Sequence, residues 1–201
     1  MPGSDIANYS VTENLTDGRQ VTIRAIRSDD KGRIADAFRE VSPESLYRRT
    51  FSAKRTLSDT ELKQLTEVDF ENVAALVSIM KEEGQDRIVG GGRYIRSGAS
   101  GGVVTAEVAF LIDDAHQGLG IGSRIFKHLV AIARASGITH FEAEVLPSNE
   151  SMLRLFARSG LPVAQARTRD SVHATIELST TEKSMQTADE PGGSDPSGGR
   201  P

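Results

Sequence analysis

The sequence predicts one α/β domain, in which a mixed sheet carries helices on both faces. Segments with the two-residue periodicity of strands alternate along the chain with segments of helical periodicity. The strongest helical pattern lies at residues 120–136 and is followed by a strand, a helix and a closing pair of strands. The length of 201 residues suits one domain of ordinary size with loose ends.

Turn and cap signals define the elements of the first 65 residues. Asp17-Gly18 is a hairpin turn signal between two strand patterns. Ser58 and Glu61 have the spacing of a capping box, in which each side chain bonds a free backbone amide of the other residue. We therefore expect a short strand before residue 17, a strand at 21–27, a helix from Asp29 or Asp30 to about residue 40, and a helix from 58 to about 65.

Apolar periodicity defines the elements that follow. Ile121, Ile125 and Leu129 recur every four residues and form an apolar stripe, which Gly137 ends. We expect strands at 72–81 and 87–97 around a turn at 82–86, a glycine-rich connection at 98–102, a strand at 103–112, a helix at 120–136, a strand at 140–146, a helix at 149–159, and strands at 163–168 and 171–178.

The two ends of the chain differ in composition from the middle. Residues 181–201 contain Pro191, Pro196, Pro201 and four glycines, and their only apolar side chains are Met185 and Ala188. Such a segment buries too little apolar area to offset the entropy of ordering it. We expect a flexible N-terminus at 1–10, a folded domain at 11–180 and a disordered tail at 181–201.

Composition excludes several classes of function. The chain has no cysteine, which excludes a disulfide framework, a thiolate zinc site and a cysteine nucleophile. A net charge of −4 gives no electrostatic footprint for nucleic acid. No apolar run is long enough to span a membrane, and the N-terminus lacks the pattern of a signal peptide. We expect a soluble, cytoplasmic protein without a metal site, in which His116 and His140 have surface or capping roles.

A glycine-rich turn precedes the strongest helix. Between Gln117 and Ser123, three glycines alternate with apolar residues, and the first helical amides that follow have no intrahelical partner. These amides and the helix dipole favour a phosphate or diphosphate, although a tight turn for packing would need the same glycines. Ser123 and Arg124 after the last glycine exclude the phosphate loop of nucleotide triphosphatases. The dinucleotide-binding fingerprint fits poorly but stays open, because an acid, Glu142, lies near the expected distance.

Two segments in this order resemble the GNAT superfamily of N-acetyltransferases. Residues 106–122 resemble a strand followed by the loop Q/R-x-x-G-x-G/A, which Gln117, Gly120 and Gly122 match. Residues 147–161 resemble the family's later segment, an asparagine followed by a helix that ends in glycine. Further upstream, residues 17–24, 42–51 and 65–70 resemble the GNAT domain of bacterial protein-lysine acetyltransferases. The resemblance covers most of residues 17–178.

The resemblance implies an α/β, mostly antiparallel sheet in which the central strands 103–112 and 140–146 splay apart. It also implies acetyl-CoA as co-substrate. The loop amides would bind its diphosphate, the strand end would bind its pantetheine arm, and the thioester would enter the gap between the splayed strands. The residues expected at the coenzyme are Phe110, Leu111, Ile112, Gln117, Gly118, Leu119, Gly120, Ile121, Gly122, Ser123 and Asn149; Asn149 can also serve as a helix N-cap.

Glu107 is the candidate general base. It is the only charged residue at 103–112, and related protein acetyltransferases carry a catalytic glutamate at the matching position. A lysine amine has a pKa of about 10.4, so a base must remove a proton before or during attack. A solvated glutamate is the alternative. The family's usual tyrosine acid is replaced by Phe156. Asp69, Glu71 and Glu144 could line an acceptor pocket for a cationic amine, but a solvated set without a function is the favoured interpretation.

The sequence thus predicts an N-acetyltransferase that moves acetyl from acetyl-CoA to a primary amine in a ternary complex. Protein lysine is the favoured acceptor, and a small-molecule amine is the alternative. Two rival functions remain open: a non-catalytic acyl-CoA sensor and a dinucleotide-binding module. We expect neither nucleic acid nor membrane as a partner.

Overall fold

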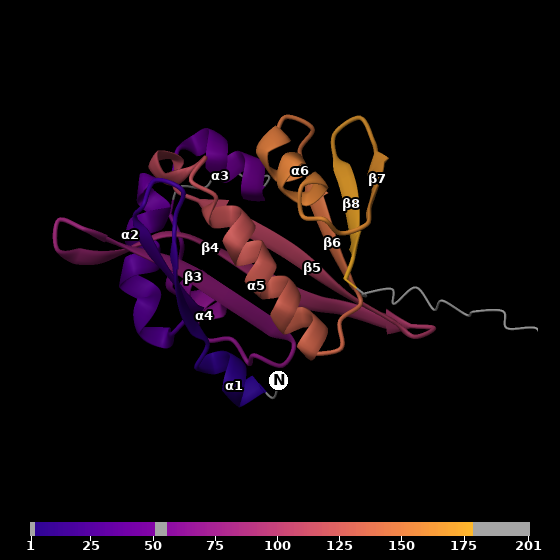
Figure 1. The fold of residues 1–201 in the computed structure, drawn as a ribbon, viewed down its shortest axis with the longest axis horizontal. Coiled ribbons are helices and arrows are strands. Elements are labelled where there is room, and N and C mark those ends of the chain that lie inside the picture. Colours follow the sequence, from indigo (N-terminus) through magenta and orange to yellow (C-terminus); the bar gives the residue numbers. More distant parts are fainter. Residues whose placement is uncertain (1–2, 51–55, 179–201) are drawn as a thin grey trace, which may run out of the picture.

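The computed structural model of this chain describes residues 3–50 and 56–178, and their strands form one eight-stranded sheet (Figure 1). The strand order is β1-β2-β3-β4-β5-β6-β8-β7. Neighbouring strands are antiparallel except for β5 and β6, which are parallel. The strands are β1 (Ser10–Asn14), β2 (Gln20–Ala25), β3 (Val73–Glu82), β4 (Gln85–Ser100), β5 (Val103–Ile112), β6 (His140–Val145), β7 (Val163–Arg167) and β8 (Val172–Glu177).

Helices cover both faces of this sheet, as the sequence predicts. Alternate residues of β3 show it: Leu76 packs in the cluster of α5, and Val77 packs under Ile34 of α2. No helix of the described segments is long and apolar enough to cross a membrane. The helices are α1 (Gly3–Ala7), α2 (Lys31–Glu40), α3 (Pro43–Thr50), α4 (Asp59–Thr66), α5 (Ile121–Ala135) and α6 (Glu150–Ala157), with the 3-10 turns η1 (Ser28–Asp30) and η2 (Asp114–His116).

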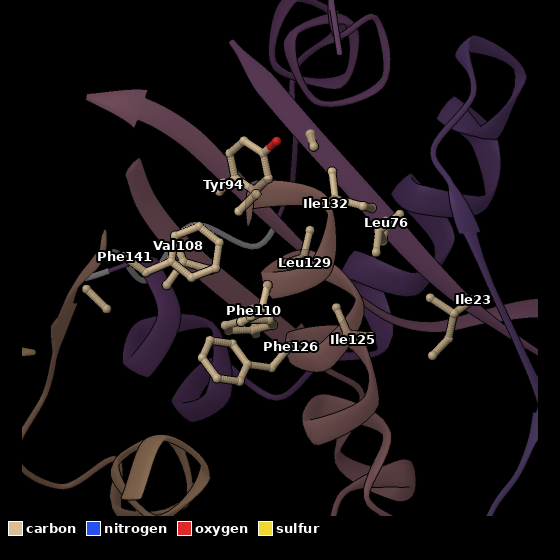
Figure 2. Packing of buried hydrophobic residues seen from close by; sticks show 14 of the residues in the cluster. Ile23, Leu76, Tyr94, Val108, Phe110, Ile125, Phe126, Leu129, Ile132 and Phe141 are labelled. Carbon is tan, nitrogen blue, oxygen red and sulfur yellow. The ribbon is translucent and has the colours of Figure 1, made fainter. Parts of the chain in front are cut away.

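The main core lies between α5 and the sheet, and the predicted apolar stripe of α5 is confirmed. Ile125 and Leu129 are 0% exposed and belong to the same buried cluster as Leu76 (Figure 2). Phe126 stands 5.8 Å from Phe110 of β5, ring centre to ring centre, in an edge-to-face arrangement. This packing fixes the axis of α5, and with it the glycine-rich turn at its N-terminus.

The two central strands separate after three paired positions, which confirms the expected splay. Thr105 lies opposite His140, Ala106 opposite Phe141, and Glu107 opposite Glu142. Beyond Glu107, β5 stays paired with β4 as far as Ile112, whereas β6 stays paired with β8. The diverging strands open a gap on the C-terminal side of Glu107.

The other predicted helices and strands are present, with two differences in the middle of the chain. The capping box of α4 forms as predicted, with the Ser58 amide donating to Glu61 Oε2 at 2.8 Å. Helix α3 was not predicted; Ser42 caps it, with its Oγ accepting from the Ser45 amide at 3.2 Å, and Asp114 Oδ2 accepts from the Ser42 amide at 2.8 Å. The expected connection at 98–102 is wrong, because β4 continues through Ser100 and only a two-glycine turn remains.

The N-terminus differs from the expectation of a flexible segment at 1–10. Residues 3–7 form α1, and the Ile6 side chain is 1% exposed within the main core. Ser10 already pairs with Arg24 of β2. An apolar side chain that reaches the core ties this short segment down. The predicted tail at 181–201 lies outside the described residues, so its disorder and the domain limits stay predictions.

Candidate active site

Two adjoining cavities open where β5 and β6 diverge. The first, here the strand cavity, has a volume of about 710 Å³ and lies between the sheet and helices α2 and α4. The second, here the loop cavity, measures about 410 Å³ and lies between the glycine-rich turn and α6. Both are lined by Phe110, Leu111, Asn149 and Met152. A long ligand can therefore pass from one cavity to the other along the end of β5.

The loop cavity gathers the residues that the sequence marks for the coenzyme. The exception is Leu119, which packs against the core instead. Glu107 lines the strand cavity. The expected coenzyme residues that line the loop cavity are Phe110, Leu111, Ile112, Gln117, Gly118, Gly120, Ile121, Gly122, Ser123 and Asn149.

The backbone of the turn is left-handed at two glycines. Gly118 has φ +79° and Gly120, the N-cap of α5, has φ +80°, a region that L-residues with a side chain rarely adopt. Arg124 donates to the Gly120 carbonyl at 3.2 Å and to the Asn14 carbonyl at 2.8 Å, and it pairs with Glu13 at 3.0 Å. The free amides at the start of α5 thus border the loop cavity in a turn that β1 holds from behind, which suits an anionic ligand.

Gln117 links this turn to the end of β5 and to α3. Its Nε2 donates to Asp114 Oδ1 at 2.9 Å and to the Ile112 carbonyl at 3.3 Å. Asp114 also accepts from the Ser42 amide, and from the hydroxyl of Ser45. The side chain of Gln117 therefore serves the local structure of the loop in addition to bordering the cavity.

Glu107 stands exposed at the point of divergence, on the face of the sheet that borders the strand cavity. Arg93 of β4 lines the same cavity, two positions along the strand from the residue paired with Glu107. Burial lowers the pKa of the Arg93 guanidinium, and the negative charge of Glu107 acts in the opposite direction. A carboxylate and a guanidinium thus share one wall of the cavity.

Of the three acids considered for an acceptor pocket, one lines the strand cavity. Glu144 lines the strand cavity, and the hydrogen bond from His173 Nδ1 at 2.8 Å lowers the pKa of its carboxyl. Asp69 instead closes a turn, with its Oδ1 accepting the amides of Asn72 and Val73 at 2.8 and 3.0 Å. Neither Asp69 nor Glu71 is among the residues that line the cavity, and both are exposed, as the favoured interpretation of a solvated set expects.

Asn149 combines the two roles that the sequence left open. Its Oδ1 accepts from the Met152 amide at 3.2 Å and from the Ser151 hydroxyl at 2.9 Å, so it caps α6. It also lines both cavities. Phe156, by contrast, is 0% exposed and borders neither cavity. Its ring is tilted against that of Phe126, with 5.5 Å between the ring centres. A hydroxyl at position 156 would point into the core rather than toward a substrate in either cavity.

His116 is buried, which contradicts the expected surface or capping role. It is 5% exposed, and its ring nitrogens lie 2.9 Å from Asp113 Oδ2 and 2.7 Å from Glu82 Oε1. Through these bonds η2 is tied to the end of β3, beside the loop cavity. Among residues 3–50 and 56–178, no group of three or more His, Cys, Asp or Glu is arranged to hold a metal ion.

Three cationic residues of the site were not predicted from the sequence. Arg93 borders the strand cavity, and Arg154 of α6 and Arg158, the C-cap of that helix, border the loop cavity. The strand cavity is lined by the carboxylates of Glu61, Glu107, Asp113 and Glu144, whereas within residues 3–50 and 56–178 no carboxylate lines the loop cavity. No local pattern around these arginines signals a ligand, because strand pairing and helix packing bring them to the cavities.

Comparison with known proteins gives a consistent result. Residues 39–161 match the sequence profile of the Acetyltransferase (GNAT) family. The chain is 31% identical over 166 residues to Acetyltransferase PA5475 of Pseudomonas aeruginosa, which covers 83% of this chain and 87% of that protein. It is 33% identical over 143 residues to Acetyltransferase Pat of Mycolicibacterium smegmatis, covering 71% of this chain but only 41% of Pat.

Solved structures show the same fold. The GNAT domain of S. lividans PAT superposes with a TM-score of 0.75 at 33% identity, over 84% of this chain and 96% of that one. The structure of yncA from Salmonella typhimurium, solved with its cofactor acetyl-CoA, superposes with a TM-score of 0.61 at 22% identity, over 84% and 99% of the two chains. On the sequence match, the relatives and the fold together, the chain belongs to the GNAT family of acetyltransferases.

Proposed function

We propose that the protein transfers an acetyl group from acetyl-CoA to a primary amine, with protein lysine as the favoured acceptor and Glu107 as the general base. One observation carries the proposal. The end of β5, the glycine-rich turn and Asn149 line a single cavity, and this cavity adjoins the one that contains Glu107. A donor that spans both cavities would present its thioester beside that carboxylate.

The loop cavity suits the coenzyme on chemical grounds. The amides at the start of α5 would bind the diphosphate, because they lack intrahelical partners and lie at the positive end of the helix dipole. The backbone of β5 beyond Glu107 would bind the pantetheine arm as an added strand, since pairing with β6 covers only three residues of β5. Support comes from yncA, a protein of the same fold that holds acetyl-CoA.

The chemistry is a direct displacement. The amine nitrogen attacks the thioester carbonyl carbon, and the Glu107 carboxylate takes up the amine proton, directly or through one water. The carbonyl oxygen gains negative charge, which a backbone amide near the end of β5 would stabilise. The C–S bond then breaks and CoA leaves as the thiolate. The chain contains no cysteine, so a cysteinyl acyl-enzyme does not form.

The strand cavity favours a cationic acceptor with an apolar stem. Its lining combines carboxylates, such as Glu61 and Glu144, with apolar side chains of α2 and α4, including Phe38 and Leu65. A lysine side chain has this composition, with four methylenes and a terminal amine. The resemblance of residues 17–24, 42–51 and 65–70 to the GNAT domain of bacterial protein-lysine acetyltransferases points the same way. A small-molecule amine is the alternative acceptor.

The test pairs acetyl-CoA titration by calorimetry with a thiol-release assay on lysine peptides and on small amines. Binding together with release of thiol in the presence of lysine peptides is expected. Release only with small amines would contradict the lysine preference but keep the reaction. Binding without any release would instead identify an acyl-CoA sensor. Affinity for NAD without affinity for CoA would identify a dinucleotide-binding module.

A further inference from the structure

Helix α6 presents cationic and polar side chains to the loop cavity along one face. Ser151, Arg154 and Arg158 all line the cavity, at spacings of three and four residues. Residues so spaced lie one above the other on a helix surface. The face of α6 that meets the cavity therefore carries two guanidinium groups in successive turns.

A close contact holds this face against the glycine-rich turn. A Cβ built at Gly122 would lie 3.2 Å from Leu155 Cδ1, so the absence of a side chain at position 122 lets α6 approach the first turn of α5. Leu155 directly follows Arg154 and lies three residues before Arg158. Both arginines are thereby placed at the rim of the cavity whose floor carries the α5 amides.

The electrostatics of the rim favour an anion. The described residues that line the loop cavity include Arg154 and Arg158, and none of them is a carboxylate. Arg154 pairs with Glu150 at 2.8 Å, a contact between side chains that are 59% and 71% exposed. Such an exposed pair contributes little and is readily exchanged for a stronger partner. A guanidinium can form two parallel hydrogen bonds to a phosphate, which makes arginine well suited to bind that group.

We propose that Arg154 and Arg158 form a second phosphate subsite, which binds the 3′-phosphate of the CoA ribose. The proposal rests on the proposed function, in which the α5 amides take the diphosphate. CoA carries a further phosphate on the adenosine ribose, outside the diphosphate. With the diphosphate at the amides, Arg154 and Arg158 are the arginines placed to bind this group among the residues that the structure describes around the loop cavity. The subsite would make the protein discriminate CoA from dephospho-CoA, which lacks the 3′-phosphate.

The experiment measures by calorimetry the dissociation constants of CoA and dephospho-CoA for the wild type and for three variants. Arg158→Ala and the double variant Arg154→Ala/Arg158→Ala remove the subsite. Arg39→Ala is the matched control, since it removes an exposed arginine of α2 that is paired with Asp36 on its own helix and lines neither cavity. We expect the wild type and Arg39→Ala to prefer CoA by about tenfold or more, given the strength of charge-assisted bonds.

In the double variant the ratio of the two constants should fall toward one, while the affinity for dephospho-CoA stays within about twofold of wild type, because the amides that hold the diphosphate are untouched. An arginine near a helix C-terminus also complements the helix dipole, but that structural role would not change the ratio. Equal weakening of both ligands would contradict the subsite and place the arginines at the diphosphate. A wild type that binds CoA and dephospho-CoA equally well would also overturn the proposed subsite. A wild type that binds neither ligand would overturn the proposed function itself.

Discussion

Glu107 and Glu142 are the last residues paired between β5 and β6, and both strands continue past them in different directions. In-register neighbours of adjacent strands share a face of the sheet, so the two carboxylates stand side by side at the point of divergence. Only Glu107 is among the residues that line the strand cavity. The fold therefore provides two chemically identical side chains, of which one is placed to act on a ligand in the gap.

The turn before α5 should tolerate an added methyl group at Gly118 better than at Gly120. Both glycines have φ near +80°, so alanine at either position costs about 1 kcal/mol of backbone strain. A Cβ at Gly118 meets nothing within 4 Å, whereas a Cβ at Gly120 would lie 2.7 Å from Arg124 Nη1. Arg124 cannot move away without losing its bonds to the Gly120 and Asn14 carbonyls.

We expect the free energy of unfolding of Gly120→Ala to fall by about 1 kcal/mol more than that of Gly118→Ala, measured by urea denaturation. The double variant Gly120→Ala/Arg124→Ala should lose less than the sum of its single variants, because the clash is absent. Equal losses for the two alanine variants would show that Arg124 does not restrict this turn.

The buried pair of Arg24 and Asp30 should be strongly coupled. The Arg24 guanidinium donates to both oxygens of Asp30 at 2.7 Å, and the Asp30 side chain is 0% exposed. Removing one partner leaves an uncompensated buried charge, so Asp30→Ala should cost about 3–5 kcal/mol of unfolding free energy. Asp36→Ala on the exposed side of α2 serves as the control and should change stability by less than about 0.5 kcal/mol. A similar small loss for both variants would contradict this role of the pair.

Asp69 should make folding depend on pH in the acid range. Burial raises the pKa of its carboxyl, but the hydrogen bonds from Asn72, Val73 and Glu71 outweigh this and bring the pKa to about 2. The folded-state pKa lies below the unfolded value of 3.8, so the stabilisation is present above pH 3.8 and is lost as the pH falls toward 2.

The measurement compares the unfolding free energies of the wild type and Asp69→Asn by urea denaturation across this range. Their difference should be constant near neutral pH and shrink below about pH 4, because the carboxyl protonates there in the unfolded chain first. Other titrating groups are common to both proteins and cancel in the difference. A difference that does not change with pH would contradict the assigned pKa.

Phe156→Tyr should not create a general acid. The side chain at 156 is fully buried against Phe126, so the new hydroxyl would lie in the core and lower the unfolding free energy by about 1–3 kcal/mol. The rate of thiol release should not rise. Tyr47→Phe, at a side chain that is 49% exposed, is the control for a hydroxyl change without burial. A gain in kcat for Phe156→Tyr would show that position 156 reaches the thioester.

Local sequence patterns were enough to predict the elements that local interactions define. The stripe of Ile121, Ile125 and Leu129 and the capping box of Ser58 and Glu61 involve residues at most a few positions apart, and both appear as predicted. Helix α3 was missed although it has a local start signal: Ser42 Oγ accepts from the Ser45 amide at 3.2 Å, and Pro43 is the first helical residue. Only the bond from the Ser42 amide to Asp114, 72 residues along the chain, leaves no local pattern.

The site residues likewise fall into those that a local motif reveals and those that only tertiary contacts bring to the site. The glycine-rich turn and Asn149 could be found from a contiguous motif, and they border one cavity. Arg93 reaches the strand cavity only through the register of β4 with β5, and Arg158 reaches the loop cavity only because Leu155 packs at Gly122. Asp69 does not reach the strand cavity, because its carboxylate accepts hydrogen bonds from the backbone amides of its own turn.

Glu107 is proposed to accept the amine proton from an acceptor held in the gap. The decisive measurement is kcat for thiol release in Glu107→Gln and in the matched variant Glu142→Gln. Each variant removes one carboxylate at the same level of the sheet. For Glu107→Gln we expect a kcat about 10²–10⁴-fold lower than wild type, with the acetyl-CoA dissociation constant unchanged. For Glu142→Gln we expect a nearly wild-type kcat. An unchanged kcat in Glu107→Gln at neutral pH would contradict this role of Glu107.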